Sequence, residues 1–212
     1  MQIFSSLDDI RKANLKFPHL AVALGMFDGV HIGHQTVIAQ AVKLAKEHDG
    51  TSAVFTFQNH PLTVIAPDKR PLIINDQAAK IRDIEELGVD VLLDIKFTKE
   101  LSSMTPEEFM AMLRDYLAPQ FVVTGPNYSF GLKGKGTPEV LAREGEKYGF
   151  KAYMHHFVYC ENSMVSSTAI RQALAEGDLA RVNKMLGRPF SIDEVVSHGK
   201  KRGRLLGFPR PI

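Results

Sequence analysis

Short apolar runs alternate along the chain with longer segments in which apolar residues recur every three or four positions. The short runs have the length of strands, and the longer segments have the pattern of helices that bury one face. Strands are expected at residues 19–24, 52–57, 89–95, 121–124 and 151–157. Helices are expected at residues 34–48, 76–87, 105–117, 138–148, 167–176 and 179–186. This alternation predicts an α/β protein with a doubly wound, mostly parallel sheet.

The ends of the predicted helices indicate where the domain stops. Gly50 and Gly88 follow two of these helices, and glycine commonly ends a helix with a left-handed backbone. Helical periodicity ceases after Leu186, where Gly, Lys and Arg become frequent. We therefore expect one domain over residues 1–186 and a short C-terminal extension over residues 187–212.

The composition is that of an ordinary folded protein. The 212 residues are 44% hydrophobic and 24% charged, which is sufficient for a buried core. The formal net charge is only +2, which argues against nucleic acid or an anionic membrane as the main partner. No signal peptide is visible, no apolar stretch approaches the roughly 20 residues that span a bilayer, and Cys160 is the sole cysteine. We therefore expect a cytoplasmic protein without a membrane partner.

The turn after the first predicted strand is the strongest candidate for a ligand site. It reads Gly25-Met-Phe-Asp-Gly-Val-His-Ile-Gly-His34, which is neither a Walker A loop nor a GxGxxG fingerprint. Ligands of open α/β sheets bind beyond the carboxyl ends of the strands. The glycines allow close backbone approach, and the following helix N-terminus offers unpaired N–H groups to an anion. His31 and His34 are therefore predicted to face bound phosphates, although histidines at a helix start more often serve capping and packing.

This turn, continued to Gln35, closely resembles the HxGH nucleotidyltransferase signature of the bacterial FAD synthetases, which are bifunctional riboflavin kinase/FMN adenylyltransferases. Three further segments match in the same order: Thr56-Phe-Gln-Asn-His-Pro61 resembles the family's TFxPHP turn, Gly125-Pro-Asn-Tyr-Ser-Phe-Gly131 its Gx(D/N)FxFG loop, and Val165-Ser-Ser-Thr-Ala-Ile-Arg171 its ISSTxIR segment. Asn59 stands where the family usually has Pro. The likeness covers roughly residues 20–186 and implies a Rossmann-like nucleotidyltransferase fold.

The resemblance implies transfer of AMP from ATP to FMN, giving FAD and pyrophosphate without a covalent enzyme intermediate. Such a transfer requires the acceptor phosphate to be in line with the leaving pyrophosphate, with the charge on the phosphoryl oxygens neutralised. The implied catalytic residues are His31, His34, Ser167, Thr168 and Arg171. The implied ATP contacts are Gly25, Phe27, Asp28, Gly33 and Asn127. The implied flavin contacts are Phe57, His60, Pro61 and Phe130.

Magnesium is expected together with ATP, because Mg²⁺ bridges and neutralises nucleotide phosphates. This ion commonly keeps water and substrate ligands, and the sequence has no dedicated cluster of metal ligands. Asp28 is the candidate residue to reach the ion through water.

Several of these assignments have a purely structural alternative. Ser166 and Arg171 also fit a capped helix with a solvated cation, Asn127 fits a turn, and the aromatic residues fit a core. Two other functions remain open. One is an HxGH transferase for another phosphorylated acceptor, such as pantetheine phosphate, nicotinate mononucleotide or glycerol phosphate. The other is a non-catalytic paralogue that senses flavin or nucleotide.

The C-terminal extension resembles the beginning of the family's riboflavin kinase module. The resemblance rests on Gly187-Arg-Pro-Phe190 and Gly203-Arg-Leu-Leu-Gly-Phe-Pro209. Where the family continues FPTAN, the chain reads Phe-Pro-Arg-Pro-Ile212. The extension is too short to close a kinase β-barrel, so we expect the chain as given to lack riboflavin kinase activity.

Overall fold

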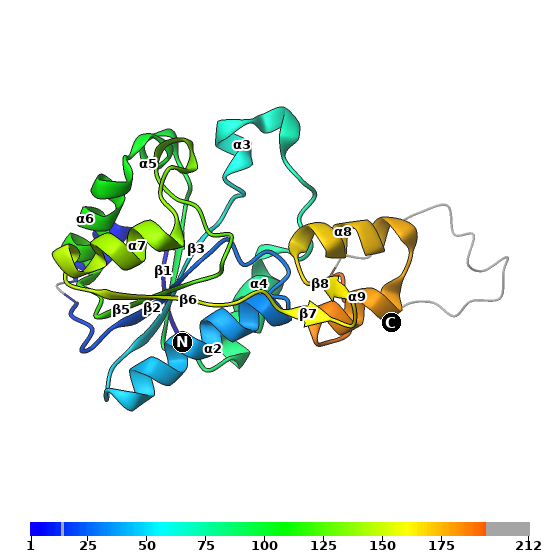
Figure 1. The fold of residues 1–212 in the computed structure, drawn as a ribbon, viewed down its shortest axis with the longest axis horizontal. Helices are drawn as coiled ribbons and strands as arrows, with labels where there is room; N and C mark the ends of the chain where they lie inside the picture. The colour runs from blue at the N-terminus through cyan, green and yellow to red at the C-terminus, as the bar shows by residue number, and fades with distance from the viewer. Residues whose placement is uncertain (14, 194–212) are drawn as a thin grey trace, which may run out of the picture.

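The structure, a computed structural model, describes residues 1–13 and 15–193. Its main feature is a six-stranded sheet with the order β1-β4-β3-β2-β5-β6 (Figure 1). The strands are β1 (Gln2–Phe4), β2 (Ala21–Leu24), β3 (Ser52–Phe57), β4 (Val91–Ile95), β5 (Phe121–Thr124) and β6 (Lys151–Met154). All neighbouring pairs are parallel, which confirms the predicted sheet type.

Helices cover both faces of this sheet. They are α1 (Leu7–Lys12), α2 (Ile32–Glu47), α3 (Leu62–Ile65), α4 (Gln77–Glu86), α5 (Lys99–Ser103), α6 (Pro106–Leu117), α7 (Pro138–Glu144), α8 (Ser167–Glu176) and α9 (Leu179–Leu186). Successive residues of a strand point to opposite faces, so Ala21 packs with the apolar side of α2 while Val22 packs with that of α6. The result is a three-layer, doubly wound domain, as predicted.

The strand order reverses direction at β2, which lies between β3 and β5. The helices α2 and α4 join β2, β3 and β4 across one face, whereas α6 and α7 join β4, β5 and β6 across the other. At such a switch point the loops leave in opposite directions and open a crevice at the carboxyl ends of the strands. The loops after β2 and β5 therefore border the place where a ligand is expected.

A second, smaller core lies beyond the sheet, at the end of the molecule that carries α8 and α9 (Figure 1). It includes Ile74, Val165, Ile170, Ala173, Val182, Met185 and Leu186. The short antiparallel hairpin of β7 (Tyr159–Cys160) and β8 (Ser163–Met164) leads the chain from β6 to α8. Ile74 belongs to the loop before α4, so this core fixes α8 and α9 to the sheet domain.

Several elements differ from the sequence prediction. The edge strand β1 and the helix α1 were not predicted, because the first twelve residues show neither a long apolar run nor several helical turns. The strand expected at residues 151–157 ends at Met154, and the His155 N–H donates a last bond to the Thr124 carbonyl, where β5 also ends. The helix expected at residues 138–148 is α7 followed by a 3₁₀ turn, η3 (Gly145–Tyr148).

The predicted domain boundary coincides with the end of α9, where Gly187 adopts a left-handed backbone with φ of 73°. Arg188 then turns back onto the domain, pairs with Asp83 of α4 and donates a hydrogen bond to the Gly29 carbonyl over 3.0 Å. Residues 194–212 of the predicted extension lie outside the described residues, so the division at residue 186 stays a prediction. Among the described residues, we find no helix with the length and apolar character needed to cross a membrane.

Candidate active site

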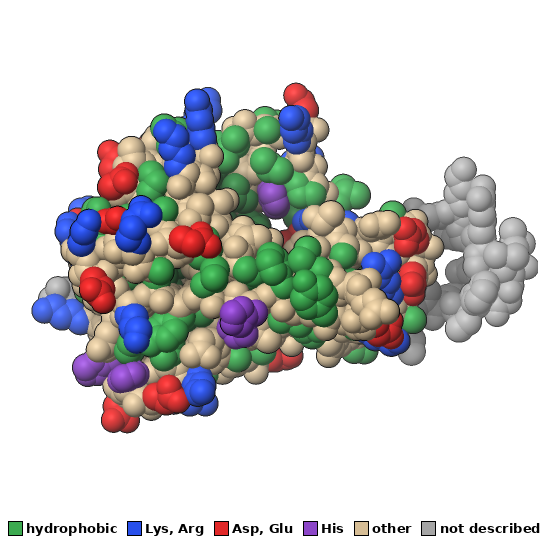
Figure 2. Space-filling model, viewed as in Figure 1, with side chains coloured by type: hydrophobic (Ala, Val, Ile, Leu, Met, Phe, Trp, Pro, Cys, Tyr) green, Lys and Arg blue, Asp and Glu red, His purple; other side chains and the backbone are tan. Residues whose placement is uncertain are grey.

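A cavity of about 470 Å³ opens at the switch point, beyond the carboxyl ends of the central strands. Figure 2 shows the surface hollowed between the segment of α3 and the rest of the domain, with hydrophobic side chains around the opening. The residues predicted for the site all line this cavity. They are Gly25, Phe27, Asp28, His31, Gly33, His34, Phe57, His60, Pro61, Asn127, Phe130, Ser167, Thr168 and Arg171.

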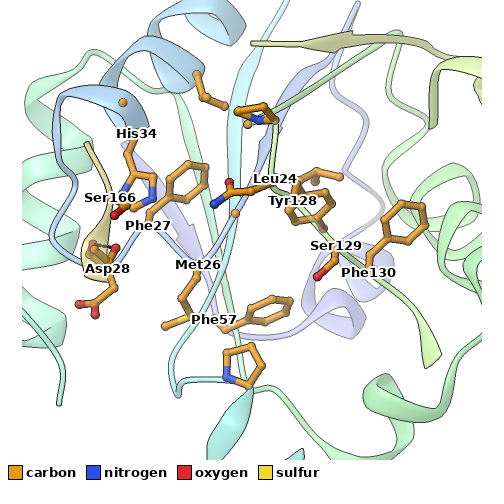
Figure 3. A pocket seen from close by; sticks show the side chains of 18 of the residues that line it. Leu24, Met26, Phe27, Asp28, His34, Phe57, Tyr128, Ser129, Phe130 and Ser166 are labelled. Carbon is orange, nitrogen blue, oxygen red and sulfur yellow. Dashed lines mark hydrogen bonds between the residues drawn. The ribbon is translucent and has the colours of Figure 1, made fainter. Parts of the chain in front are cut away.

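The cavity has a polar end and an aromatic end. Asp28, His34 and Ser166 lie together at one end, and Tyr128 and Phe130 lie at the other (Figure 3). The polar end is formed by the turn after β2 and the beginning of α8, whereas the aromatic end is formed by the loops after β3, β4 and β5. A ligand with a charged part and a flat apolar part fits this division.

The turn after β2 has an unusual backbone. Phe27 and Val30 have φ of 52° and 38°, a left-handed conformation that costs a non-glycine residue about 1–2 kcal/mol. The Phe27 ring folds under the turn, and a Cβ at position 25 would lie only 2.8 Å from it. Position 25 therefore requires glycine. The ring is 1% exposed and its neighbour is the His34 ring, at 5.3 Å and 84°, so Phe27 supports a site residue from below.

His31 and His34 are brought together by the first turn of α2. His31 is the N-cap residue, and its Nδ1 accepts a hydrogen bond from the His34 N–H over 3.2 Å. The two rings stack with centroids 3.5 Å apart and planes inclined by 16°. Because Nδ1 of His31 acts as an acceptor, the proton of the neutral ring is on Nε2. The capping role and the cavity-lining role thus belong to the same residue.

Burial keeps both rings neutral at ordinary pH. Desolvation lowers the pKa of His31 to about 4, and it lowers the pKa of His34 well below 6.5, with a further contribution from the neighbouring His31. Neutral imidazoles bind an anion as N–H donors and not as cations. Positive potential at this end comes instead from the N-termini of α2 and α8, while the charge of Arg171 is offset by Asp28.

Asp28 and Arg171 form an ion pair beside the histidines. Asp28 is 4% exposed, and its other carboxylate oxygen accepts the Ile74 N–H over 2.9 Å. Arg171 also donates from Nε to the Leu72 carbonyl over 2.6 Å. The guanidinium predicted to bind phosphate is therefore also the clamp that holds the loop before α4 against the turn after β2.

The beginning of α8 is a capped helix start that also borders the cavity. The Ser166 hydroxyl caps the helix by accepting the Ala169 N–H over 3.1 Å, as a capped helix requires. The Ser167 hydroxyl donates to the Asp28 carbonyl over 3.0 Å, and Thr168 lines the cavity. This contact joins the N-terminus of α8 to the turn after β2, so two helix N-termini border one cavity.

The aromatic end is larger than the sequence indicated. Phe57 meets the Phe97 ring edge to face at 5.0 Å, and Phe130 stacks on Tyr128 at 5.8 Å. Sequence reasoning missed Phe97 and Tyr128, as well as Met26, Leu101 and Phe109. Phe97 was in principle detectable, because it follows a predicted strand at the same carboxyl edge as Phe57. The other residues could be assigned to the cavity only with knowledge of how the loops and α6 are placed against the sheet.

His60 lies in the loop after β3 with a defined ring orientation. Its Nδ1 accepts the Leu62 N–H over 3.1 Å, so its Nε2 carries the proton when the ring is neutral. Burial, then the nearby Arg171, lowers its pKa. His60 is thus a neutral donor between the aromatic end and the Asp28–Arg171 pair.

The residues at the polar end do not form a metal-binding cluster. Among residues 1–13 and 15–193, no group of three or more His, Cys, Asp or Glu side chains is arranged to hold a metal ion. Each carboxylate oxygen of Asp28 has one protein partner, and a carboxylate accepts about four hydrogen bonds, so contact with an ion through water stays a prediction. An ion that enters with the phosphates of a nucleotide is compatible with this arrangement.

The fold and the site define a nucleotidyltransferase-like α/β protein: a histidine pair and two helix N-termini face one cavity at the switch point of a parallel sheet. The chain belongs to the FAD synthetase family, because the model of that family matches residues 15–169.

Curated relatives carry the name bifunctional riboflavin kinase/FMN adenylyltransferase. The relative from Bacillus subtilis is 40% identical over 190 residues, which are 89% of this chain and 60% of that protein. The relative from Escherichia coli K12 is 34% identical over 190 residues, with the same coverage of both chains. A relative from Buchnera aphidicola is 33% identical over 211 residues, which are 99% of this chain and 67% of that protein. The chain therefore spans about 60% of the length of several of its relatives.

Two solved structures show the same fold. A protein from Streptococcus pneumoniae, described as a macrolide-efflux protein, superposes with a TM-score of 0.80 at 30% identity, covering 98% of this chain and 66% of that one. Pantothenate synthetase from Thermus thermophilus superposes with a TM-score of 0.56 at 16% identity over 88% of this chain and 81% of that one, which demonstrates a shared fold alone.

Proposed function

We propose that this domain transfers AMP from ATP to FMN, forming FAD and pyrophosphate. The observation that carries the proposal is the single cavity that joins a polar end, with two helix N-termini, to an aromatic end. ATP and FMN each combine a flat ring system with phosphate, and the reaction brings their phosphates together. Membership of the FAD synthetase family and relatives named FMN adenylyltransferase support the choice of acceptor.

In this reaction an oxygen of the FMN phosphate attacks the α-phosphorus of ATP. A new P–O bond forms, the bond between the α-phosphorus and the bridging oxygen breaks, and pyrophosphate leaves with the electron pair. The attacking group belongs to the substrate, so the proposal needs no protein nucleophile and no covalent intermediate. The protein contributes placement and stabilisation of charge.

The histidine pair is proposed to donate hydrogen bonds to the phosphoryl oxygens. Neutral rings suit this role, because His31 and His34 lie too close for two cations to be stable together. The hydroxyls of Ser167 and Thr168, at the start of α8, are proposed to contact the leaving phosphates. Mg²⁺ is proposed to enter with ATP as part of the substrate and to neutralise charge on its phosphates.

Arg171 is proposed to bind the β- and γ-phosphates while it keeps the loop before α4 in place. Its Nε and one Nη contact Leu72 and Asp28, whereas Nη1 has no hydrogen-bond partner within the described part of the chain. Arginine suits this double role because its planar guanidinium carries five donors. A lysine cannot make both sets of contacts.

The test is to incubate the protein with Mg²⁺ and ATP in the presence of FMN, pantetheine phosphate, nicotinate mononucleotide or glycerol phosphate. Products are separated by chromatography, and pyrophosphate is assayed in parallel. We expect FAD and an equal amount of pyrophosphate with FMN, and no adenylylated product with the other acceptors. Transfer to one of the other acceptors in preference to FMN would contradict the proposal, as would binding of flavin and nucleotide without turnover.

A further inference from the structure

We propose that Asn59 is a positioning residue that fixes the shape of the acceptor wall, defined here as Phe57, His60 and Pro61 after β3 together with Phe97 and Leu101 after β4. These five residues line the aromatic end of the cavity. The inference rests on the proposed function, because it assumes that the flavin of FMN occupies this end.

The two halves of the acceptor wall lie where the chain leaves the sheet at the ends of β3 and β4. The pairing of β3 and β4 ends with Phe57 opposite Ile95, and the Gln58 N–H still donates to the Ile95 carbonyl over 3.0 Å. Beyond this point the side chain of Asn59 joins the two segments. Its Oδ1 accepts the Phe97 N–H over 2.9 Å, and its Nδ2 donates to the Phe97 carbonyl over 3.2 Å.

Two residues of an antiparallel ladder exchange such a reciprocal pair, whereas a residue in a parallel ladder such as that of β3 and β4 bonds to two different residues. The Asn59 amide therefore joins the two loops directly, by a contact that the parallel ladder of β3 and β4 does not itself supply. The consequence is seen in the rings, because Phe97 is held where its ring meets that of Phe57 at 5.0 Å and 79°.

Asn59 also fixes the other side of the loop. Its Nδ2 donates to the Thr63 hydroxyl over 3.0 Å, and that hydroxyl donates to the His60 carbonyl over 2.7 Å. His60 and Pro61 are thus held between Asn59 and the first turn of α3. Asparagine is half-buried here, and the amide supplies a donor and an acceptor that proline, the usual residue of the family motif at this position, lacks.

Replacement of Asn59 by Ala leaves the Phe97 N–H and C=O groups without these partners and frees the two loops from each other. A hydrogen bond of this kind is expected to be equivalent to about a five- to tenfold change in an equilibrium constant. We expect Asn59→Ala to weaken FMN binding by about five- to tenfold and to change the KM for ATP by less than about twofold. Asn162→Ala, in the exposed turn of the β7–β8 hairpin, is the matched control.

The experiment measures FMN binding by quenching of flavin fluorescence in the presence of Mg²⁺ and a nonhydrolysable ATP analogue, so it does not depend on turnover. Thermal unfolding of each variant checks that it is folded. The same titration with Phe97→Leu and with the double variant measures the coupling. The inference predicts a combined effect clearly smaller than the product of the two single effects, because Asn59 acts partly through the Phe97 ring.

Three results would overturn the inference and leave the proposed function standing. They are an unchanged FMN affinity in folded Asn59→Ala, equal losses of affinity for FMN and ATP, and full additivity with Phe97→Leu. Wild-type protein that binds FMN but makes no FAD would contradict the proposed function alone, and the weaker binding of Asn59→Ala would still support the inference. Wild-type protein that binds no FMN would contradict both.

Discussion

The imidazole rings of His31 and His34 stack 3.5 Å apart at the first turn of α2, and the His34 N–H donates to Nδ1 of His31. The same contact that caps the helix fixes the orientation of the two rings relative to the cavity. The helix start and the proposed phosphate-binding pair are therefore one structure, and the chemistry proposed for it follows from the neutral state of both rings.

Loss of either ring should reduce turnover much more than it reduces folding stability. We expect His31→Ala and His34→Ala each to lower kcat/KM for FAD formation by on the order of 10²-fold, as loss of one preorganised donor does elsewhere. Steady-state kinetics with both substrates varied measures this. His48→Ala, an exposed histidine at the other end of α2, is the control and should retain wild-type kinetics. Wild-type turnover in both site variants would remove the histidines from the mechanism.

The lowered pKa of His31 predicts that the protein loses stability in mild acid. In the folded protein this ring stays neutral down to about pH 4, whereas an imidazole of the unfolded chain takes up a proton near pH 6.5. Between these values the unfolded state binds a proton that the folded state does not, so the free energy of unfolding falls as pH falls. Thermal melts from pH 7.5 to 4.5 should show a smaller decline in Tm for His31→Gln than for wild type. Parallel declines would contradict the buried, neutral assignment.

Arg171→Lys should not be a conservative change, because lysine cannot bind Asp28, the Leu72 carbonyl and a phosphate together. We expect at least about a tenfold rise in the KM for ATP, with a smaller change in the KM for FMN. Arg181→Lys, on the neighbouring helix α9, is the matched control. If Arg171→Lys kept wild-type ATP kinetics, the residue would only clamp the loop before α4 against the turn after β2.

A buried charge pair behind the acceptor wall should matter for stability. Lys80 is 3% exposed, donates to the Phe57 carbonyl over 2.6 Å and lies 3.8 Å from Asp94, while burial lowers the pKa of Lys80 and raises that of Asp94. Removing one partner of a buried pair costs about 3–5 kcal/mol. Chemical denaturation should show a loss of this size for Lys80→Met and a smaller loss for Lys80→Met combined with Asp94→Leu. A double variant as unstable as the sum of both single variants would show that the pair is not coupled.

Much of the fold could be predicted because its elements are set by local patterns. The strands at residues 52–57 and 121–124 and the helices α8 and α9 have the predicted limits, since apolar runs and helix-terminal residues mark both ends. The three-residue strand β1 carries no such pattern, and it forms only because β4 offers a free edge. Its existence depends on partners far along the chain.

The position of the candidate site residues in one cavity was predictable to a similar degree. The turn from Gly25 to His34 carries its own chemistry, so the histidine pair could be found without coordinates. The Asp28–Arg171 pair joins residues 143 positions apart, and the Asn59–Phe97 contact depends on how far β3 and β4 remain in register. No local sequence pattern predicts contacts of this kind, because they depend on how distant segments pack together.

The predicted absence of riboflavin kinase activity is tested separately from adenylyl transfer. The protein is incubated with riboflavin, Mg²⁺ and ATP labelled on the γ-phosphate, and the flavins are separated by chromatography. We expect no labelled FMN, because the reaction proposed for the described cavity joins two phosphates and does not activate a hydroxyl. Labelled FMN at a rate comparable to FAD formation would show that this prediction is wrong.

The most direct test of the central claim follows the α-phosphate of ATP. Wild-type protein is incubated with FMN, Mg²⁺ and ATP labelled on the α-phosphate, and labelled FAD, pyrophosphate and acid-precipitated protein are measured over time. The account predicts that label enters FAD with one pyrophosphate released for each FAD, and that none stays on the protein. Folded protein that produces no labelled FAD from FMN, or that carries the label covalently during turnover, would contradict it.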